Sequence, residues 1–123
     1  MQASGLPCRR VLLVDDNDQV RLALRLVLEG WGHVVEEADD GLDGVRKALD
    51  WRPEVAVVDI DMPVLDGYGL ARRVRRALGR GVRLIAFTAH DDRERTLASG
   101  FDAHLLKPAD PERVHHLLFQ GAA

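Results

Sequence analysis

The sequence predicts an open α/β fold in which a five-stranded parallel sheet carries helices on both faces, with the strand order 2-1-3-4-5. Short apolar runs, segments of helical period between them, and a strand-then-helix order repeated five times predict this fold. Repeated units of this kind have right-handed crossovers, which distribute the helices over both faces. We therefore expect a doubly wound (βα)5 domain.

The predicted strands fall into two kinds. Four runs are almost wholly apolar and rich in β-branched residues, as in parallel strands covered on both faces. They are residues 11–14, 55–58, 84–87 and 105–106. A fifth strand is predicted over residues 33–38, where two valines precede two glutamates. Its mixed composition indicates an edge strand.

The predicted helices occupy residues 18–29, 42–49, 68–78, 91–98 and 111–118. The first is the clearest, because Val20, Leu24 and Leu28 share one face and Gly30 follows as a stop signal. Aspartates near the helix starts are predicted to be ordinary turn and cap residues. These are Asp18, Asp66, Asp91 and Asp110.

Composition limits the classes of protein to consider. The 123 residues predict a single domain over 1–123, with 1–8 as a flexible N-terminal segment. A net charge of -3 gives no general reason to expect nucleic acid or anionic membrane as a partner, and the apolar stretches are too short to span a membrane. Cys8 is the only cysteine, so an internal disulfide is excluded and a reducing, cytoplasmic location is expected.

Polar residues follow the buried strands at the point where each one ends. Asp15 and Asp16 follow the first strand, and Asp59 follows the third. The carboxyl ends of parallel strands share one edge, and strands 1 and 3 are neighbours in the predicted order, at the crevice where ligands bind. The three carboxylates are therefore expected to crowd together.

Crowded carboxylates need a counter-charge, and oxygen ligands without Cys or His favour Mg²⁺. Thr88 and Lys107 end the remaining two strands, where a hydroxyl and an ammonium could contact phosphate oxygens. A carboxylate nucleophile among these groups would form an acyl phosphate. The pattern indicates phosphoryl transfer assisted by Mg²⁺.

At this stage the sequence resembles the receiver domain of two-component response regulators over nearly its whole length. The resemblance rests on four motifs in the same order. They are Leu13-Val14-Asp15-Asp16-Asn17, Asp59-Ile60-Asp61-Met62-Pro63-Val64-Leu65-Asp66-Gly67, Phe87-Thr88-Ala89 and Lys107-Pro108. It implies a flavodoxin-like fold and a signalling switch or relay that is not an enzyme beyond its own phosphorylation and dephosphorylation.

The resemblance also implies roles for individual residues. Asp59 would be phosphorylated, Asp15 and Asp16 would bind Mg²⁺ together with Asp59 and the main-chain carbonyl of Asp61, and Thr88 and Lys107 would contact the phosphoryl group. The donor would be a histidine kinase or a histidine phosphotransfer protein, with a downstream effector or a homodimer as partner after phosphorylation. The bond between Lys107 and Pro108 is expected to be cis.

Three positions tune or depart from the family pattern. Asp61 adds a carboxylate to an already anionic site, and we expect it to weaken attraction for the phosphoryl donor. His90 lies where family side chains influence the lifetime of the phosphoryl group. His104 replaces the Tyr or Phe that swings inward in many family members, so the resemblance does not carry that switch over to this chain.

A basic run occupies residues 72–83. It contains Arg72, Arg73, Arg75, Arg76, Arg80 and Arg83. In an acidic chain it is expected to be a solvated helix face that could also dock an acidic partner, and not a nucleic-acid site.

Two other functions remain open. Asp59 and Asp61 resemble the nucleophile pair of haloacid-dehalogenase-type phosphatases, although that motif normally ends the first strand and here it ends the third. The second alternative is a receiver-like module that binds proteins without accepting phosphate.

Overall fold

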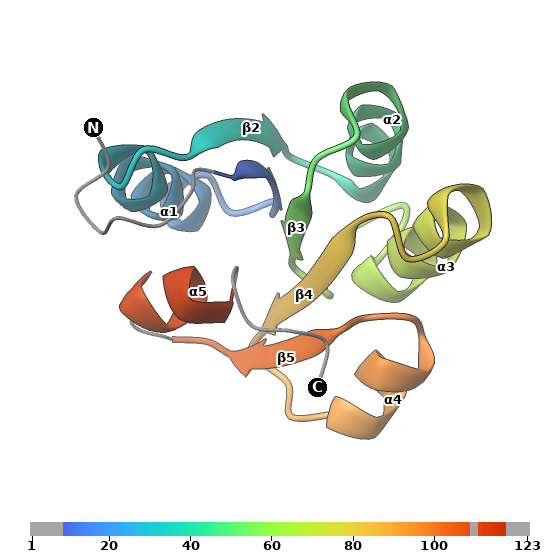
Figure 1. The fold of residues 1–123 in the computed structure, drawn as a ribbon. Coiled ribbons are helices and arrows are strands. Elements are labelled where there is room, and N and C mark those ends of the chain that lie inside the picture. Colours follow the sequence, from blue (N-terminus) through green and yellow to red (C-terminus); the bar gives the residue numbers. More distant parts are fainter. Residues whose placement is uncertain (1–8, 109–110, 118–123) are drawn as a thin grey trace.

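The computed structural model describes residues 9–108 and 111–117 (Figure 1). Its sheet has five parallel strands in the order β2-β1-β3-β4-β5, which confirms the predicted topology. The strands are β1 (Arg10–Val14), β2 (Val34–Ala38), β3 (Val55–Val58), β4 (Arg83–Thr88) and β5 (Ala103–Leu106). The helices are α1 (Asp18–Gly30), α2 (Gly41–Trp51), α3 (Gly67–Leu78), α4 (Arg93–Ala98) and α5 (Pro111–Leu117).

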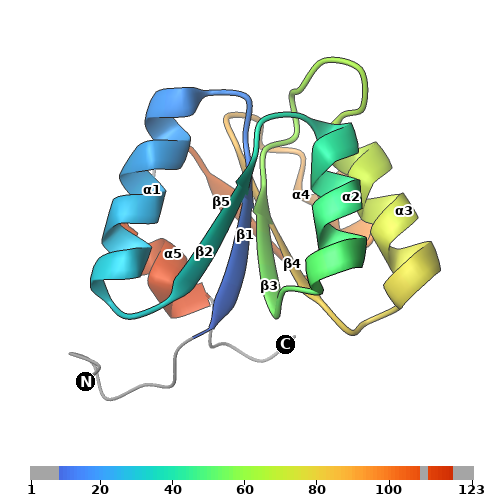
Figure 2. The same cartoon turned by 90° about the horizontal axis from the view of Figure 1, so that it is seen from above.

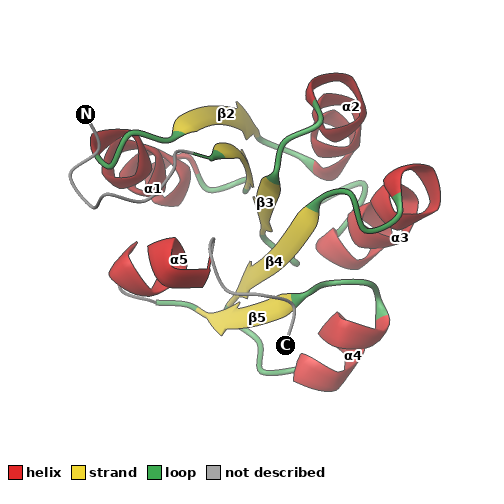
Figure 3. Cartoon of the chain, in the orientation of Figure 1, coloured by secondary structure: helices red, strands yellow, loops and turns green. Residues whose placement is uncertain are grey.

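The helices form two layers, one on each face of the sheet. α1 and α5 cover one face, and α2, α3 and α4 cover the other (Figures 1 and 2). Alternate residues of β1 serve the two faces, since Val11 and Leu13 belong to the core under α1 and α5, while Leu12 and Val14 belong to the opposite core. Helices flank the sheet on both sides (Figure 3). The resulting burial on both faces explains why β3, and β1 after Arg10, are continuously apolar.

The helix starts lie within two residues of the predicted ones. Asp66 accepts a hydrogen bond from the Gly69 amide as the N-cap of α3, as predicted. Asp91 lies in the connection before α4, as expected for a turn residue, and Asp18 is the first residue of α1, but neither is the N-cap. Asn17 caps α1 and Asp92 caps α4, each through its own side-chain oxygen. The predicted cap Asp110 and the predicted flexible segment 1–8, with Cys8, lie outside the described residues.

Strand register brings the predicted site residues to one edge of the sheet. Val14 pairs with Val58, and the Asp59 amide donates to the Val14 carbonyl at 2.8 Å. At the other end of the site, the Lys107 amide donates to the Thr88 carbonyl at 2.7 Å. The residues after β1, β3 and β5 are therefore held at the same edge as Thr88, the last residue of β4.

Gly67 lets α3 begin directly against the strand end that carries Asp59. A Cβ atom at this position would lie 2.6 Å from the Asp59 carbonyl oxygen and 2.8 Å from the Ile60 Cα. Both obstacles are backbone atoms, which cannot rotate away. A hydrogen bond stabilises this close approach of α3 to the strand end, because the Gly67 amide donates to the Ile60 carbonyl at 2.8 Å.

Replacing Gly67 by alanine is expected to lower the free energy of unfolding by about 1 to 3 kcal/mol, because the added methyl group overlaps the backbone after β3. Gly69→Ala is the matched control in the same helix. Its Cβ would overlap only the end of the Leu65 side chain, which can move, and would lie in ordinary contact with Asp66 Oδ1 at 3.5 Å, while alanine favours the helix. Urea denaturation measures both variants. Equal stability of the two would contradict the assigned role of Gly67.

Candidate functional site

Three carboxylates gather at the edge of the sheet, as predicted. One oxygen each from Asp15, Asp16 and Asp59 lies within 4.8 Å of the other two. Asp15 and Asp59 are 4% and 7% exposed, whereas Asp16 is exposed. Such an arrangement, with two shielded carboxylates and one open to solvent, leaves room for water and phosphate oxygens around a cation.

Lys107 supplies a positive charge to this cluster. Its Nζ atom lies 2.9 Å from Asp15 Oδ2 and 3.5 Å from Asp59 Oδ1. The ammonium also lies over the Phe87 ring, 5.3 Å from its centroid. The peptide bond between Lys107 and Pro108 is cis, which confirms that prediction.

Asp59 is the carboxylate that the surroundings perturb most clearly. Burial, reinforced by the charges of Asp15 and Asp16, raises its pKa to about 6, although Lys107 opposes the shift. Without a further cation, the ionised form of Asp59 is thus disfavoured in the folded protein. A divalent ion among the three carboxylates would remove that penalty.

The predicted tuning residues lie beside the cluster. The Thr88 hydroxyl is buried at the end of β4 and accepts a hydrogen bond from the His90 amide at 3.1 Å. The His90 side chain forms an ion pair with Asp61, and both side chains are largely exposed. His104 Nε2 lies 3.1 Å from the His90 carbonyl oxygen. Asp61, His90 and His104 therefore form one connected group, which the sequence did not indicate.

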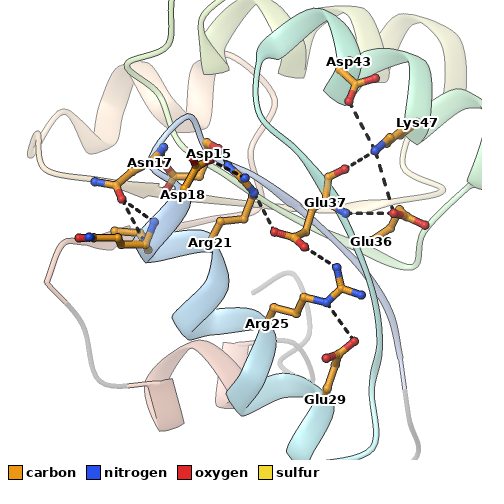
Figure 4. Close-up of polar contacts among 12 residues, drawn as sticks. Asp15, Asn17, Asp18, Arg21, Arg25, Glu29, Glu36, Glu37, Asp43 and Lys47 are labelled. Atoms are coloured by element: carbon orange, nitrogen blue, oxygen red, sulfur yellow. Dashed lines mark hydrogen bonds and ion pairs between the residues drawn. The ribbon is translucent and has the colours of Figure 1, made fainter.

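Arg21 is a contributor to the site that sequence reasoning missed. Its guanidinium donates to the Asp15 carbonyl at 2.6 Å, to Glu37 at 2.8 Å and to Asp18 at 2.7 Å (Figure 4). Arg21 thereby links α1, β2 and the strand end that carries Asp15. The three-residue spacing from Asp18 to Arg21 is readable as a helical ion pair, but the contacts with Glu37 and the Asp15 backbone depend on the tertiary fold.

The same network continues away from the acidic cluster. Glu37 also pairs with Arg25, which in turn contacts Glu29 at 3.1 Å (Figure 4). These cations hold the pKa of Glu37 below its usual range, although burial acts in the opposite direction. The charges around β2 are therefore matched within the fold.

The fold and the residues at the sheet edge together indicate the class of protein. A doubly wound domain that collects three carboxylates, a buried hydroxyl and an ammonium at the carboxyl edge of its sheet is suited to Mg²⁺-assisted phosphoryl transfer. The donor set fits the ion, since the carboxylates are hard oxygen ligands and the clustered residues include no Cys or His. Along the described segments, no helix is both long enough and apolar enough to span a bilayer.

Comparison with known proteins identifies the family. The family model for the response regulator receiver domain matches residues 11–119, so the chain belongs to the response regulator receiver domain family. A transcriptional regulatory protein PrrA from Mycobacterium leprae is 38% identical over 108 residues, which cover 85% of this chain and 46% of that protein. The chain thus spans about half the length of this relative.

Solved structures support the same assignment. The receiver domain of the sensor histidine kinase PA1611 from Pseudomonas aeruginosa, with a magnesium ion coordinated in its active site cleft, has 34% identity and a TM-score of 0.82. That match covers 91% of this chain and 95% of the other. The chemotaxis response regulator CheY4 of Vibrio cholerae has 28% identity and a TM-score of 0.84, with coverage of 91% and 97%. The predicted family and fold are therefore confirmed.

Replacing Asp59 by Asn is expected to stabilise the Mg²⁺-free protein at pH 7.5, by up to about 3 kcal/mol if the pKa rises from 3.8 to about 6. A raised pKa in the folded state means that ionised Asp59 opposes folding. The gain is therefore largest above pH 6 and shrinks as the pH falls from 6 towards 4, where wild-type Asp59 takes up its proton.

Denaturant titrations between pH 4 and 8 measure this difference. Asp61→Asn is the control, because the Asp61 side chain is 60% exposed and its removal should change stability by less than about 0.5 kcal/mol. A gain for Asp59→Asn that is independent of pH would contradict the assigned cause.

Proposed function

We propose that Asp59 accepts a phosphoryl group from a phosphohistidine on a histidine kinase or a histidine phosphotransfer protein. The observation that carries this proposal is the placement of Asp59, which is nearly buried, shares a cluster with Asp15 and Asp16, and lies 3.5 Å from the Lys107 ammonium. Family membership supports it, because response regulators work with histidine kinases in two-component systems.

The chemical step follows from the groups present. A carboxylate oxygen of Asp59 attacks phosphorus, an O–P bond forms, and the P–N bond to the donor histidine breaks with its electron pair returning to the imidazole nitrogen. Lys107, 3.5 Å from Asp59, would neutralise charge on a phosphoryl oxygen, and the buried Thr88 would donate its hydroxyl hydrogen to another. Hydrolysis later returns Asp59 to the free carboxylate and resets the switch.

We assign the metal ligands to Asp15, Asp16, Asp59 and the main-chain carbonyl of Asp61. When bound, Mg²⁺ would supply positive charge for the phosphoryl oxygens and the ionised acceptor. The Arg21 guanidinium donates to the main-chain carbonyl of Asp15, and the Lys107 ammonium donates to the side-chain carboxylate of the same residue. Both contacts keep the acidic cluster in place before a phosphoryl donor arrives.

The phosphatase alternative is less well supported. Asp59 ends the third strand rather than the first, and Asp61 forms an ion pair with His90 instead of extending towards a vacant acid/base position. A single assay separates the two functions. Repeated turnover of a small phosphomonoester favours a phosphatase, while stoichiometric labelling that decays slowly favours an acceptor.

The signalling context is part of the proposal. We propose a cytoplasmic domain, covering residues 1–123, that passes its state to an effector or to a second copy of itself after phosphorylation. The half-length match to PrrA is compatible with a separate output unit in a longer protein. This domain is not expected to bind nucleic acid or membrane.

Incubation with acetyl phosphate and Mg²⁺ is expected to add one phosphoryl group, detected by intact-protein mass, and Asp59→Asn should abolish the addition. Asp66→Asn is the matched control, because asparagine retains the oxygen that caps α3. Labelling of Asp59→Asn at the wild-type rate would overturn the assignment. Failure of beryllofluoride to bind the wild type would favour the module that does not accept phosphate.

Asp61→Asn is expected to speed phosphorylation about two- to five-fold, because it removes a negative charge from the path of an anionic donor. The measurement is the initial labelling rate at fixed pH and salt.

Asp61 and His90 contact each other, so their effects on the lifetime of the phosphorylated protein should be coupled. The half-life of the phosphorylated form is measured for Asp61→Asn, His90→Ala and the double variant, and the effect of the double variant should differ from the combined effects of the single ones. Strict additivity would show that the ion pair does not act as a unit.

A further inference from the structure

α3 carries a concentration of positive charge that the phosphoryl site does not use. The helix contains four arginines and no acidic residue. Arg72, Arg73 and Arg76 are exposed on it, and Arg80, with its side chain 72% exposed, follows two residues after the helix ends at Leu78. We call these four residues the arginine row. It extends from the middle of α3 to just beyond its C-terminal end, whereas Asp59 lies against Gly67 at the start of the helix.

On α1 and α2, by comparison, arginines form ion pairs with acidic residues of the same helix. On α1, Arg21 pairs with Asp18 and Arg25 with Glu29, and on α2, Arg46 pairs with Asp43. Each of these pairs has the spacing that stabilises a helix. On α3, by contrast, Arg72 and Arg76 are four residues apart, and like charges at that spacing destabilise a helix. The arrangement therefore costs stability instead of adding to it.

Contacts that stabilise the fold explain only some of the arginines in this run. Arg75 makes such contacts, since its guanidinium donates to the carbonyls of Gly79, Val82 and Gly100 and to the Asp102 carboxylate. Favourable interaction with the negative end of the helix dipole extends only over the last turn, which contains Arg75 and Arg76. The helix dipole therefore does not explain the positive charges of Arg72 and Arg73.

Three members of the arginine row, Arg72, Arg76 and Arg80, line an open groove between α3 and the end of α4, with a volume of about 490 Å³. Within the described part of the chain, its lining contains four arginines and no carboxylate. The lining residues are Arg72, Arg75, Arg76, Gly79, Arg80, Ala98, Ser99 and Gly100. Asp102 lies outside the lining and divides its two oxygens between Arg75 and Arg80. The groove is therefore strongly positive in a chain of net charge -3.

We propose that this groove docks an acidic segment of a partner protein. Guanidinium groups bind carboxylates through paired, charge-assisted hydrogen bonds, and the exposed side chains of Arg72 and Arg76 are available for them. Arg72 and Arg76 lie about one helical turn apart on α3, roughly 6 Å along its axis, which matches carboxylates about two residues apart in an extended chain. A short segment with alternating acidic residues fits the charge and the size of the site.

Charge distribution favours a peptide over nucleic acid. A duplex is a continuous polyanion with one charge per roughly 1.7 Å, and it would extend past the short arginine row onto a surface that is acidic in total. A short acidic segment meets only the local positive field. The proposal is independent of phosphorylation at Asp59, because the groove is lined by residues from Arg72 onwards, whereas Asp59 lies against Gly67 at the start of α3.

The test uses a fluorescein-labelled peptide of nine residues that alternates Glu and Ser, with anisotropy as readout at two salt concentrations. The variant is Arg72→Gln with Arg76→Gln. The matched control is Arg93→Gln with Arg113→Gln, which removes the same net charge from exposed positions on α4 and α5. Urea denaturation of all three proteins shows whether each is folded.

We expect the Arg72→Gln, Arg76→Gln variant to bind the peptide at least ten-fold more weakly than the control, which should bind within two-fold of wild type. The variant should unfold at about the same urea concentration as wild type, because relief of the like-charge repulsion on α3 and loss of the favourable position of Arg76 in the last turn oppose each other. Equal peptide binding by variant and control would overturn the proposal. Tighter binding of a 20-base-pair DNA duplex than of the peptide, lost in the variant, would overturn it in favour of nucleic acid.

Discussion

Mutual repulsion among three carboxylates is the constraint around which this domain is organised. The sheet topology forces Asp15, Asp16 and Asp59 to one edge, and burial of two of them prevents water from screening the repulsion. Burial, together with the charges of Asp15 and Asp16, raises the pKa of Asp59 even though the Lys107 ammonium opposes the shift. A divalent cation at that edge would therefore make the ionised form of Asp59 less costly.

The contacts around the cluster hold these charges in place. Lys107 and Asn17 each bind one oxygen of the Asp15 carboxylate, and Arg21 binds the carbonyl of the same residue. Gly67 brings α3 against the backbone of Asp59 from the opposite layer of the molecule. Helices from both layers and the last strand therefore meet at the site, so its geometry depends on the whole sheet rather than on one loop.

Much of this arrangement could be predicted from the sequence. The β-branched apolar runs specify buried parallel strands, and a single topological rule then places Asp15 beside Asp59 without knowledge of any contact. The predicted capping residues were less accurate, because adjacent polar residues can each supply a cap. The start of α1 at Asp18 is as predicted, but Asn17 provides its cap oxygen, and at α4 the cap is Asp92, next to the predicted Asp91. The contacts of Arg21, and the connection from Asp61 through His90 to His104, join segments whose distance is set only by tertiary packing.

The link between Lys107 and Asp15 joins side chains 92 positions apart in the sequence, and it connects the first strand to the segment that follows the last. This non-covalent contact links two segments that are far apart in the sequence. Any event that moves Lys107 away from Asp15 would break the contact next to β5, which is an edge strand of the sheet. Amide hydrogen exchange in β5 should then report events at the acidic cluster, although β5 lies at the edge of the sheet.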